Sequence, residues 1–163
     1  MTHNIINGSV PGMEIFSQKL VDARHTGTIM HQMVSKYYTD MAPWADLDVL
    51  SMFETIAKIP YHADPPNIEV LKRPYYTMKQ IGPGGDCDDK AIAFASWAVL
   101  NSIPYRFIGA GRKKPGHKFF QRILLTHVFP QVYIFGKWIT VDATYPFNII
   151  GSNLGGYDRV EIL

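Results

Sequence analysis

The chain has 163 residues, of which 47% are hydrophobic and 13% aromatic, so we exclude an intrinsically disordered protein and expect one domain with a sizeable core. Its formal net charge of +2 gives no reason to expect a nucleic-acid or membrane partner. The single cysteine excludes an intrachain disulfide and a thiolate-rich zinc site, and no other cofactor motif is visible.

The N-terminal residues carry no targeting pattern. Residues 1–12 contain Asn, Gly, Ser and Pro and predict an irregular arm, without the basic start and apolar run of a signal peptide. No stretch reaches the ~18 apolar residues that a membrane span requires. We therefore expect a soluble protein in the cytoplasm or within a larger assembly such as a virus particle.

Helical patterns fill the first half of the chain. Residues 13–41 predict a helix that breaks near Gly27. Residues 46–57 predict a second helix with one apolar stripe. The residues of that stripe are Leu47, Leu50, Phe53 and Ile56. Three prolines then close this helix, and an extended connection is expected through Tyr76.

The cysteine lies where a glycine-rich loop meets an apolar run. Residues 91–100 contain no Gly, Pro or charge and are rich in alanine, which indicates a buried helix over residues 87–101. Asp86 is the expected N-cap, so Cys87 falls in the first turn, where the helix dipole favours a thiolate. Asp88 and Asp89 oppose a thiolate, so the thiol needs a cationic partner such as a histidine.

Strands are expected in the second half, over residues 105–110, 120–135 and 138–145, with a short piece at 159–162. Helices followed by antiparallel strands indicate an α+β fold. We expect N-terminal helices and a central helix carrying the cysteine, packed on an antiparallel sheet.

His127 and Asp142 fall on the last two long strands. A turn centred on residues 135–136 makes the numbers of paired residues sum to 271, which brings Asp142 diagonally next to His127 on one face. A two-residue turn at 136–137 would separate them further, and Pro130 predicts a bulge or an edge. In either register both side chains project from the same face.

A thiol, an imidazole and a carboxylate are the groups that nucleophilic catalysis needs. The imidazole takes the thiol proton, and the carboxylate fixes the tautomer of the ring. Each residue alone is more often structural: a lone cysteine is usually a core residue, and a strand histidine rarely acts in catalysis. Their order and placement favour the functional interpretation.

Sequence motifs over about residues 44–146 strengthen that interpretation. In chain order they are Ile59-Pro60-Tyr61, Asp64-Pro65-Pro66, Pro74-Tyr75-Tyr76-Thr77, Gly85-Asp86-Cys87-Asp88-Asp89, Ile103-Pro104 with Arg106, His127-Val128 with Val132-Tyr133, Gly136-Lys137-Trp138, and Val141-Asp142-Ala143-Thr144. Together they resemble the transglutaminase-like superfamily, whose fold is a variant of the papain-like cysteine protease fold. Pro130 and Gln131 depart from the family pattern, in which an aromatic residue and then Glu often follow the histidine.

The resemblance implies Cys87 as nucleophile, His127 as general base and acid, and Asp142 as the orienting carboxylate. Gln80 and Tyr76 are candidate oxyanion donors beside the backbone N–H of Cys87. We expect one domain over residues 1–163, in which a helical extension (1–43) and a tail (147–163) flank the catalytic core (44–146) that the resemblance implies. No metal or organic cofactor is implied, and helix capping explains the aspartates around Cys87.

The activity that this resemblance implies is that of a peptidase, amidase or transglutaminase-like acyltransferase on a protein or peptide, with hydrolysis ahead of crosslinking. A second hypothesis is a structural or adaptor subunit of a larger assembly, and a third combines both roles. The basic segment 112–118 is expected to be a solvated hairpin tip, or else a lip that recruits an acidic partner or closes over the cleft.

Overall fold

The computed structural model describes residues 12–17, 22–82, 84–152 and 156–163. Its helices are α1 (Ala23–Tyr37), a 3₁₀ helix (Tyr38–Trp44), α2 (Val49–Ala57), α3 (Pro74–Met78) and α4 (Cys87–Leu100). Its strands are β1 (Met13–Ser17), β2 (Ile68–Lys72), β3 (Tyr105–Gly111), β4 (His127–Ile134), β5 (Lys137–Thr140) and β6 (Arg159–Ile162). The α+β prediction is confirmed.

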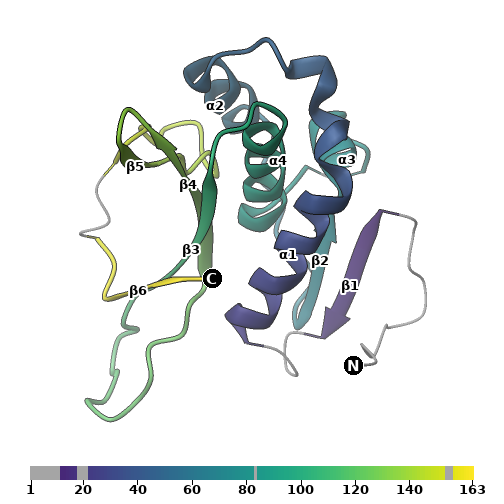
Figure 1. Ribbon diagram of the computed structural model, residues 1–163. Coiled ribbons are helices and arrows are strands. Elements are labelled where there is room, and N and C mark those ends of the chain that lie inside the picture. The colour runs from purple at the N-terminus through teal and green to yellow at the C-terminus, as the bar shows by residue number, and fades with distance from the viewer. Residues whose placement is uncertain (1–11, 18–21, 83, 153–155) are drawn as a thin grey trace.

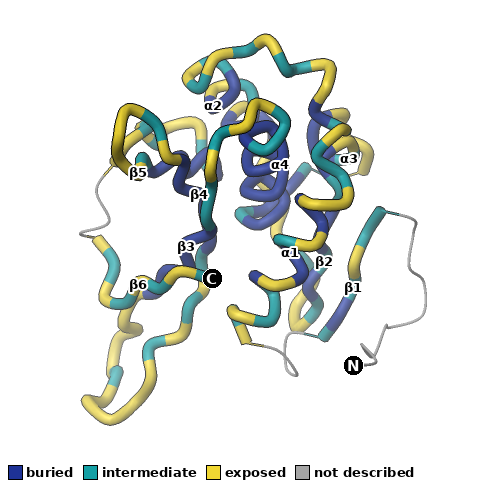
Figure 2. Tube along the Cα trace, viewed as in Figure 1, coloured by how far each residue is buried: buried dark blue, intermediate teal, exposed yellow. Residues whose placement is uncertain are grey.

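Helix α4 lies at the centre of the molecule (Figure 1). An antiparallel sheet of order β5-β4-β3-β6 covers one side, while the 3₁₀ helix, α1, α2, α3 and strand β2, which pairs with β1, cover the others. Two apolar clusters pack against it, one containing Phe94 and Trp97 and the other containing Ile92 and Phe107. An alanine-rich helix without a polar stripe is therefore buried nearly all round, as its sequence predicted (Figure 2).

The predicted first helix is wrong in two respects. Residues Met13–Ser17 form strand β1, which pairs with β2, and α1 runs unbroken through Gly27. A Cβ atom on Gly27 would lie 2.7 Å from Leu163 Cβ, so this glycine permits close packing and does not end a helix. The predicted arm, apart from Gly12, lies outside the described residues.

The other boundary errors share one physical origin, which is tertiary contact. The expected stripe on α2 holds for Phe53 and Ile56, but Leu50 is 52% exposed. The connection expected to be extended contains β2 and α3, because β1 supplies a pairing partner for β2. The strand predicted over 120–135 begins only at His127, since β3 ends at Gly111 and leaves the preceding residues without a strand to pair with.

The hairpin register is the predicted one. Gln131 pairs with Thr140 and Ile134 with Lys137, so the numbers sum to 271. Pro130 makes no bulge: it lies where β4 extends past the end of β5, so its missing N–H breaks no ladder bond. Strand β5 also ends earlier than predicted, at Thr140, and the chain beyond it turns toward α4.

Candidate active site

Cys87 is the first residue of α4, and the residues before it explain why the helix begins there. The Asp86 carboxylate accepts a hydrogen bond from Asp89 N (3.5 Å), so the predicted N-cap is confirmed. A Cβ atom on Gly84 would lie 2.0 Å from the carbonyl oxygen of Pro60, and only glycine allows this approach. The glycine-rich loop thereby seats the first turn of α4 against the segment that leads to Tyr61.

His127 and Asp142 form a hydrogen-bonded pair at the end of the sheet next to α4. Asp142 Oδ2 lies 2.8 Å from His127 Nε2, and Asp142 Oδ1 accepts from Thr144 N at 3.1 Å. Burial alone would raise the pKa of Asp142, but the hydrogen bonds from His127 and Thr144 outweigh it and hold this pKa below its usual value. Asp142 is therefore ionised at neutral pH.

This pair assigns the proton on the imidazole. An ionised carboxylate can only accept a hydrogen bond, so Nε2 of His127 carries a proton, and in the neutral ring the lone pair is on Nδ1. Among the described residues, Nδ1 has no hydrogen-bond partner. The rings of Phe129 and Tyr157 lie 5.5 Å and 6.1 Å from the imidazole and hold its plane.

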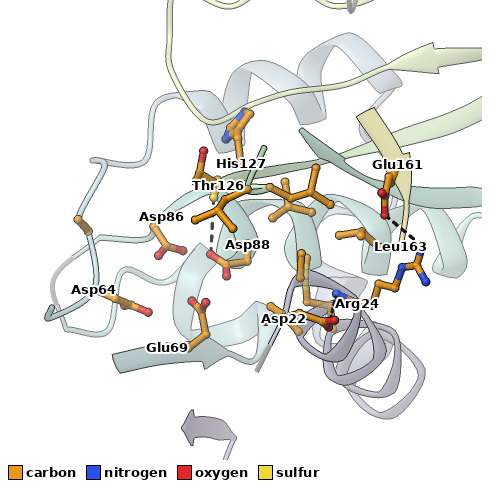
Figure 3. A pocket seen from close by; sticks show the side chains of 18 of the residues that line it. Asp22, Arg24, Asp64, Glu69, Asp86, Asp88, Thr126, His127, Glu161 and Leu163 are labelled. Atoms are coloured by element: carbon orange, nitrogen blue, oxygen red, sulfur yellow. Dashed lines mark hydrogen bonds and ion pairs between the residues drawn. The ribbon is translucent and has the colours of Figure 1, made fainter. Parts of the chain in front are cut away.

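Cys87 and His127 line the same cavity, which has a volume of 590 Å³. The thiol donates to Asp88 Oδ1 at 3.8 Å, and this is its one hydrogen bond to a described side chain (Figure 3). The backbone N–H of Val128, the residue after His127, donates a hydrogen bond to the sulfur, and this lowers the pKa of the thiol. The structure thus brings the thiol beside the start of β4, without a hydrogen bond to the ring.

The electrostatics of the thiol differ from the sequence expectation. Burial raises the pKa of Cys87, and the carboxylates of Asp86, Glu69 and Asp142 raise it further, while the N–H of Val128 opposes them. The thiol is therefore protonated at rest. The dipole argument fails here because the first turn is buried and surrounded by negative charge.

An acidic cluster borders the other side of Cys87. Oxygen atoms of Asp64, Glu69 and Asp86 all lie within 4.8 Å of one another, and Figure 3 shows them and Asp88 converging. Burial and then the charge of Asp86 raise the pKa of Asp64 to about 8, and burial and then Cys87 raise that of Asp88. The carboxylates of Asp64, Glu69 and Asp86 could hold a hard divalent cation.

Two buried lysines connect α4 to neighbouring segments of the chain. Lys72 Nζ lies 2.9 Å from Asp89 Oδ2 in a buried ion pair. Lys90 is 2% exposed, and its Nζ donates to the carbonyl oxygens of Ile59 (2.6 Å) and Thr144 (2.8 Å). Burial lowers the pKa of Lys90 to about 8. Lys90 thus links the helix of Cys87 to the residue that donates to Asp142.

The predicted oxyanion donors lie elsewhere. Gln80 is exposed at the end of α3 with φ of 52°, and Tyr76 packs against Tyr75 and Arg73. Neither residue lines the cavity of Cys87. Gln80 was predicted from the resemblance to the upstream glutamine of papain-like enzymes and Tyr76 as a comparable candidate, but both lie on or just after the short helix α3, outside the cavity of the nucleophile.

Sequence reasoning missed Tyr61, Tyr157 and Lys90. Tyr61 lines the cavity, and burial and then the neighbouring Cys87 raise the pKa of its hydroxyl, so the hydroxyl stays protonated. Tyr61 lies in one of the quoted motifs, and Lys90 follows Cys87 by one helical turn, so each had a usable signal. Tyr157 had none, because it reaches His127 only through the pairing of β6 with β3.

One solved structure with a similar arrangement is that of a candidate cysteine protease from Cytophaga hutchinsonii, with a TM-score of 0.44 and 15% sequence identity. The alignment covers 91% of this chain and 54% of that protein, so this chain spans about half its length. No protein-family model and no curated protein match the sequence. Membership of the transglutaminase-like superfamily stays a prediction from the motifs.

No described helix is both long and apolar enough to cross a lipid bilayer.

Proposed function

We propose that this protein is a cysteine-dependent enzyme that cleaves or exchanges amide bonds of a protein or peptide through a thioester. The observation that carries the proposal is the 2.8 Å pair of His127 Nε2 and Asp142 Oδ2, whose ring lines the same cavity as the chain's one thiol. Cys87 is the nucleophile, His127 the base and then the acid, and Asp142 the orienting carboxylate.

In the acylation step, His127 Nδ1 takes the proton from the Cys87 thiol. The thiolate then attacks the carbonyl carbon of the amide and forms a tetrahedral intermediate. The imidazolium returns this proton to the departing nitrogen, the C–N bond breaks, and a thioester remains. Asp142 stabilises the imidazolium, and substrate binding has to displace the thiol from Asp88.

Two donors are available for the oxyanion of the intermediate. The backbone N–H of Cys87 belongs to the first residue of α4, where helix N–H groups have no intrahelical acceptor. Tyr61 lines the same cavity, and its hydroxyl remains protonated at neutral pH because its pKa is raised. Tyr61 takes the role that the sequence assigned to Gln80 or Tyr76.

The thioester is resolved by water or by an amine. Water, deprotonated by His127, adds to the carbonyl and gives a carboxylic acid and the free thiol, which is hydrolysis. An amine gives a new amide bond, which is crosslinking. We place hydrolysis first because water needs no second binding site.

The test is the rate at which iodoacetamide alkylates Cys87 near neutral pH. We expect His127→Ala to slow alkylation by at least about tenfold, because the base that accepts the thiol proton is lost. His62→Ala, which removes an exposed imidazole outside the proposed pair, is the matched control and should react like wild type. Equal rates in wild type and His127→Ala would overturn the proposal.

A second candidate is a binding or adaptor subunit. It is favoured by the thiol itself, which has a raised pKa and donates to Asp88, not to the imidazole. Mass spectrometry after incubation with casein separates the two candidates. The enzyme forms an acyl adduct on Cys87 or releases fragments, and Cys87→Ala does neither. An adaptor gives the same result with and without Cys87.

A further inference from the structure

The long connection between β3 and β4 forms a second cavity, of 430 Å³. Its cationic lining residues are Arg112, Lys114 and Arg122, with His117 beside them. Arg112, Lys114 and Arg122 are exposed, and the connection extends away from the helices (Figures 1 and 2). The segment predicted as a hairpin tip or a lip is thus the wall of a basic cavity.

The carboxylates near this cavity, Asp22 beside Arg122 and Asp158, whose Oδ2 accepts from Lys113 N at 2.8 Å, do not line it. Within the described part of the chain, Arg112, Lys114 and Arg122 form no ion pair, and no Asp or Glu is among the described lining residues. Other arginines behave differently, since Arg73 pairs with Asp40 and Arg159 with Glu161. Clustered cations that are not engaged in ion pairs attract an anionic ligand.

The cavity has a defined shape and adjoins the candidate active site. His117 N donates to Lys114 O (3.0 Å), which closes a turn within the basic segment. The Arg112 guanidinium lies 4.8 Å from the centre of the Tyr157 ring, and that ring stacks on His127 at 6.1 Å. Arg122, Leu124 and Thr126 line both cavities, so one ligand can occupy the two together.

We propose that the basic cavity binds an acidic segment of the polypeptide substrate and so presents a neighbouring amide to Cys87. The location of the reacting amide rests on the function proposed above, whereas binding of the acidic segment does not. A polypeptide fits better than a nucleic acid, because the adjoining cavity of Cys87 carries the carboxylates of Glu69 and Asp86. A polyanion charged along its whole length would meet these carboxylates, but a peptide charged at one end would not.

Fluorescence anisotropy tests this with a labelled peptide in which a run of Glu precedes a neutral run of Gly and Gln. Wild type should bind it, and added salt should weaken binding because the contacts are electrostatic. The double variant Lys114→Glu/Arg122→Glu should bind about tenfold or more weakly. Lys58→Glu/Lys137→Glu, which changes the net charge equally at exposed positions outside the cavity, should bind as wild type does.

The outcomes separate this proposal from the proposed function. Cys87→Ala should bind the peptide like wild type, because peptide binding does not need the thiol. If Cys87 of the wild-type protein is unreactive while the peptide still binds, the enzyme proposal is overturned and the acidic-segment proposal stands. Absent binding, or equal weakening in both double variants, overturns the acidic-segment proposal. Tighter binding of a single-stranded oligonucleotide than of the peptide overturns it as well.

Discussion

Two groups of carboxylates border Cys87, and they are in opposite electrostatic states. Asp142, on the sheet side, has its pKa lowered, whereas Asp64 and Asp88, on the side of β2, have theirs raised. Burial is the largest influence in every case, so burial does not distinguish them. The difference lies in the donors: Asp142 receives hydrogen bonds from His127 and Thr144, while the acidic cluster is mainly carboxylates facing carboxylates.

This contrast assigns different tasks to the two sides. A carboxylate held ionised beside an imidazole orients the ring and stabilises its charged form. On the other side, burial and then the charges of Asp86 and Glu69 raise the pKa of the neighbouring thiol and keep it protonated. Under the proposed function, Cys87 therefore lies between an imidazole that can accept its proton and carboxylates that oppose its ionisation.

The largest expected effect comes from removing the charge of Asp142. Asp142→Asn keeps the shape but presents the ring with a neutral amide, so the tautomer with a proton on Nε2 is no longer enforced. We expect hydrolysis of dye-labelled casein to fall by about 10³-fold or more, as in other triads. Asp46→Asn, at an exposed position before α2, is the control. Unchanged hydrolysis in Asp142→Asn would show that the pair of His127 and Asp142 takes no part in the reaction.

The sequence could predict the pair of His127 and Asp142 on the sheet side of Cys87, but it could not predict the acidic cluster on the other side. Side chains alternate between the two faces of β4, and the tight turn after Ile134 fixes which residues pair across the hairpin. Together these local features place His127 near Asp142. The acidic cluster joins Asp64, Glu69 and Asp86 from separate segments, which only tertiary packing brings together. Asp86 itself was predictable, but only as a helix cap.

The same limit explains the errors in the fold. Helix α4 was predicted well because its apolar run is continuous and its cap is local. Strand β1 was predicted as helix, since its strand character comes from pairing with β2 more than fifty residues away in the chain. Exposed Phe120 suggested a strand by composition, yet no neighbouring strand is available to it.

A third kind of carboxylate sharpens the comparison. Asp89 is fully buried, whereas Asp64 is half-buried, and Asp89 has a cation beside it, Lys72. Asp89→Asn leaves the ammonium buried and unpaired, so we expect urea denaturation at pH 8 to show a loss of about 3 kcal/mol. Adding Lys72→Met should recover much of that loss, because both charges are then absent. Equal midpoints for wild type and Asp89→Asn would contradict this.

Lys90 tests whether the environment of Asp142 depends on α4. Lys90→Met removes the hydrogen bonds to Ile59 and Thr144, so the segment that donates to Asp142 loses its tie to the helix. We expect Cys87 alkylation to slow by about tenfold, with a changed pH profile. Met52→Ala, a cavity-forming change in α2, controls for lost stability and should leave that profile unaltered.

Neutralising the acidic side should act in the opposite direction. Asp86→Asn keeps an oxygen to cap α4 but removes a charge that raises the pKa of Cys87. We expect alkylation at pH 8 to become about threefold to tenfold faster, since more thiolate is present. Asp48→Asn makes the same exchange at the N-cap of α2 and should leave alkylation unchanged. Slower alkylation in Asp86→Asn would mean that the cap, not the charge, governs Cys87.

The smallest effect concerns the stability of the acidic cluster itself. Asp64 has its pKa raised from 3.8 to about 8, so the folded state binds more protons than the unfolded state between these values. The stability that this group contributes is complete below pH 4 and is lost as the pH rises toward 8. Asp64→Asn retains an acceptor for Val70 N without the charge, so its urea midpoint should fall less between pH 5 and pH 8 than that of wild type. A steeper fall in the variant would mean that Asp64 is ionised in the folded protein, and the two sides of Cys87 would then no longer differ in charge state.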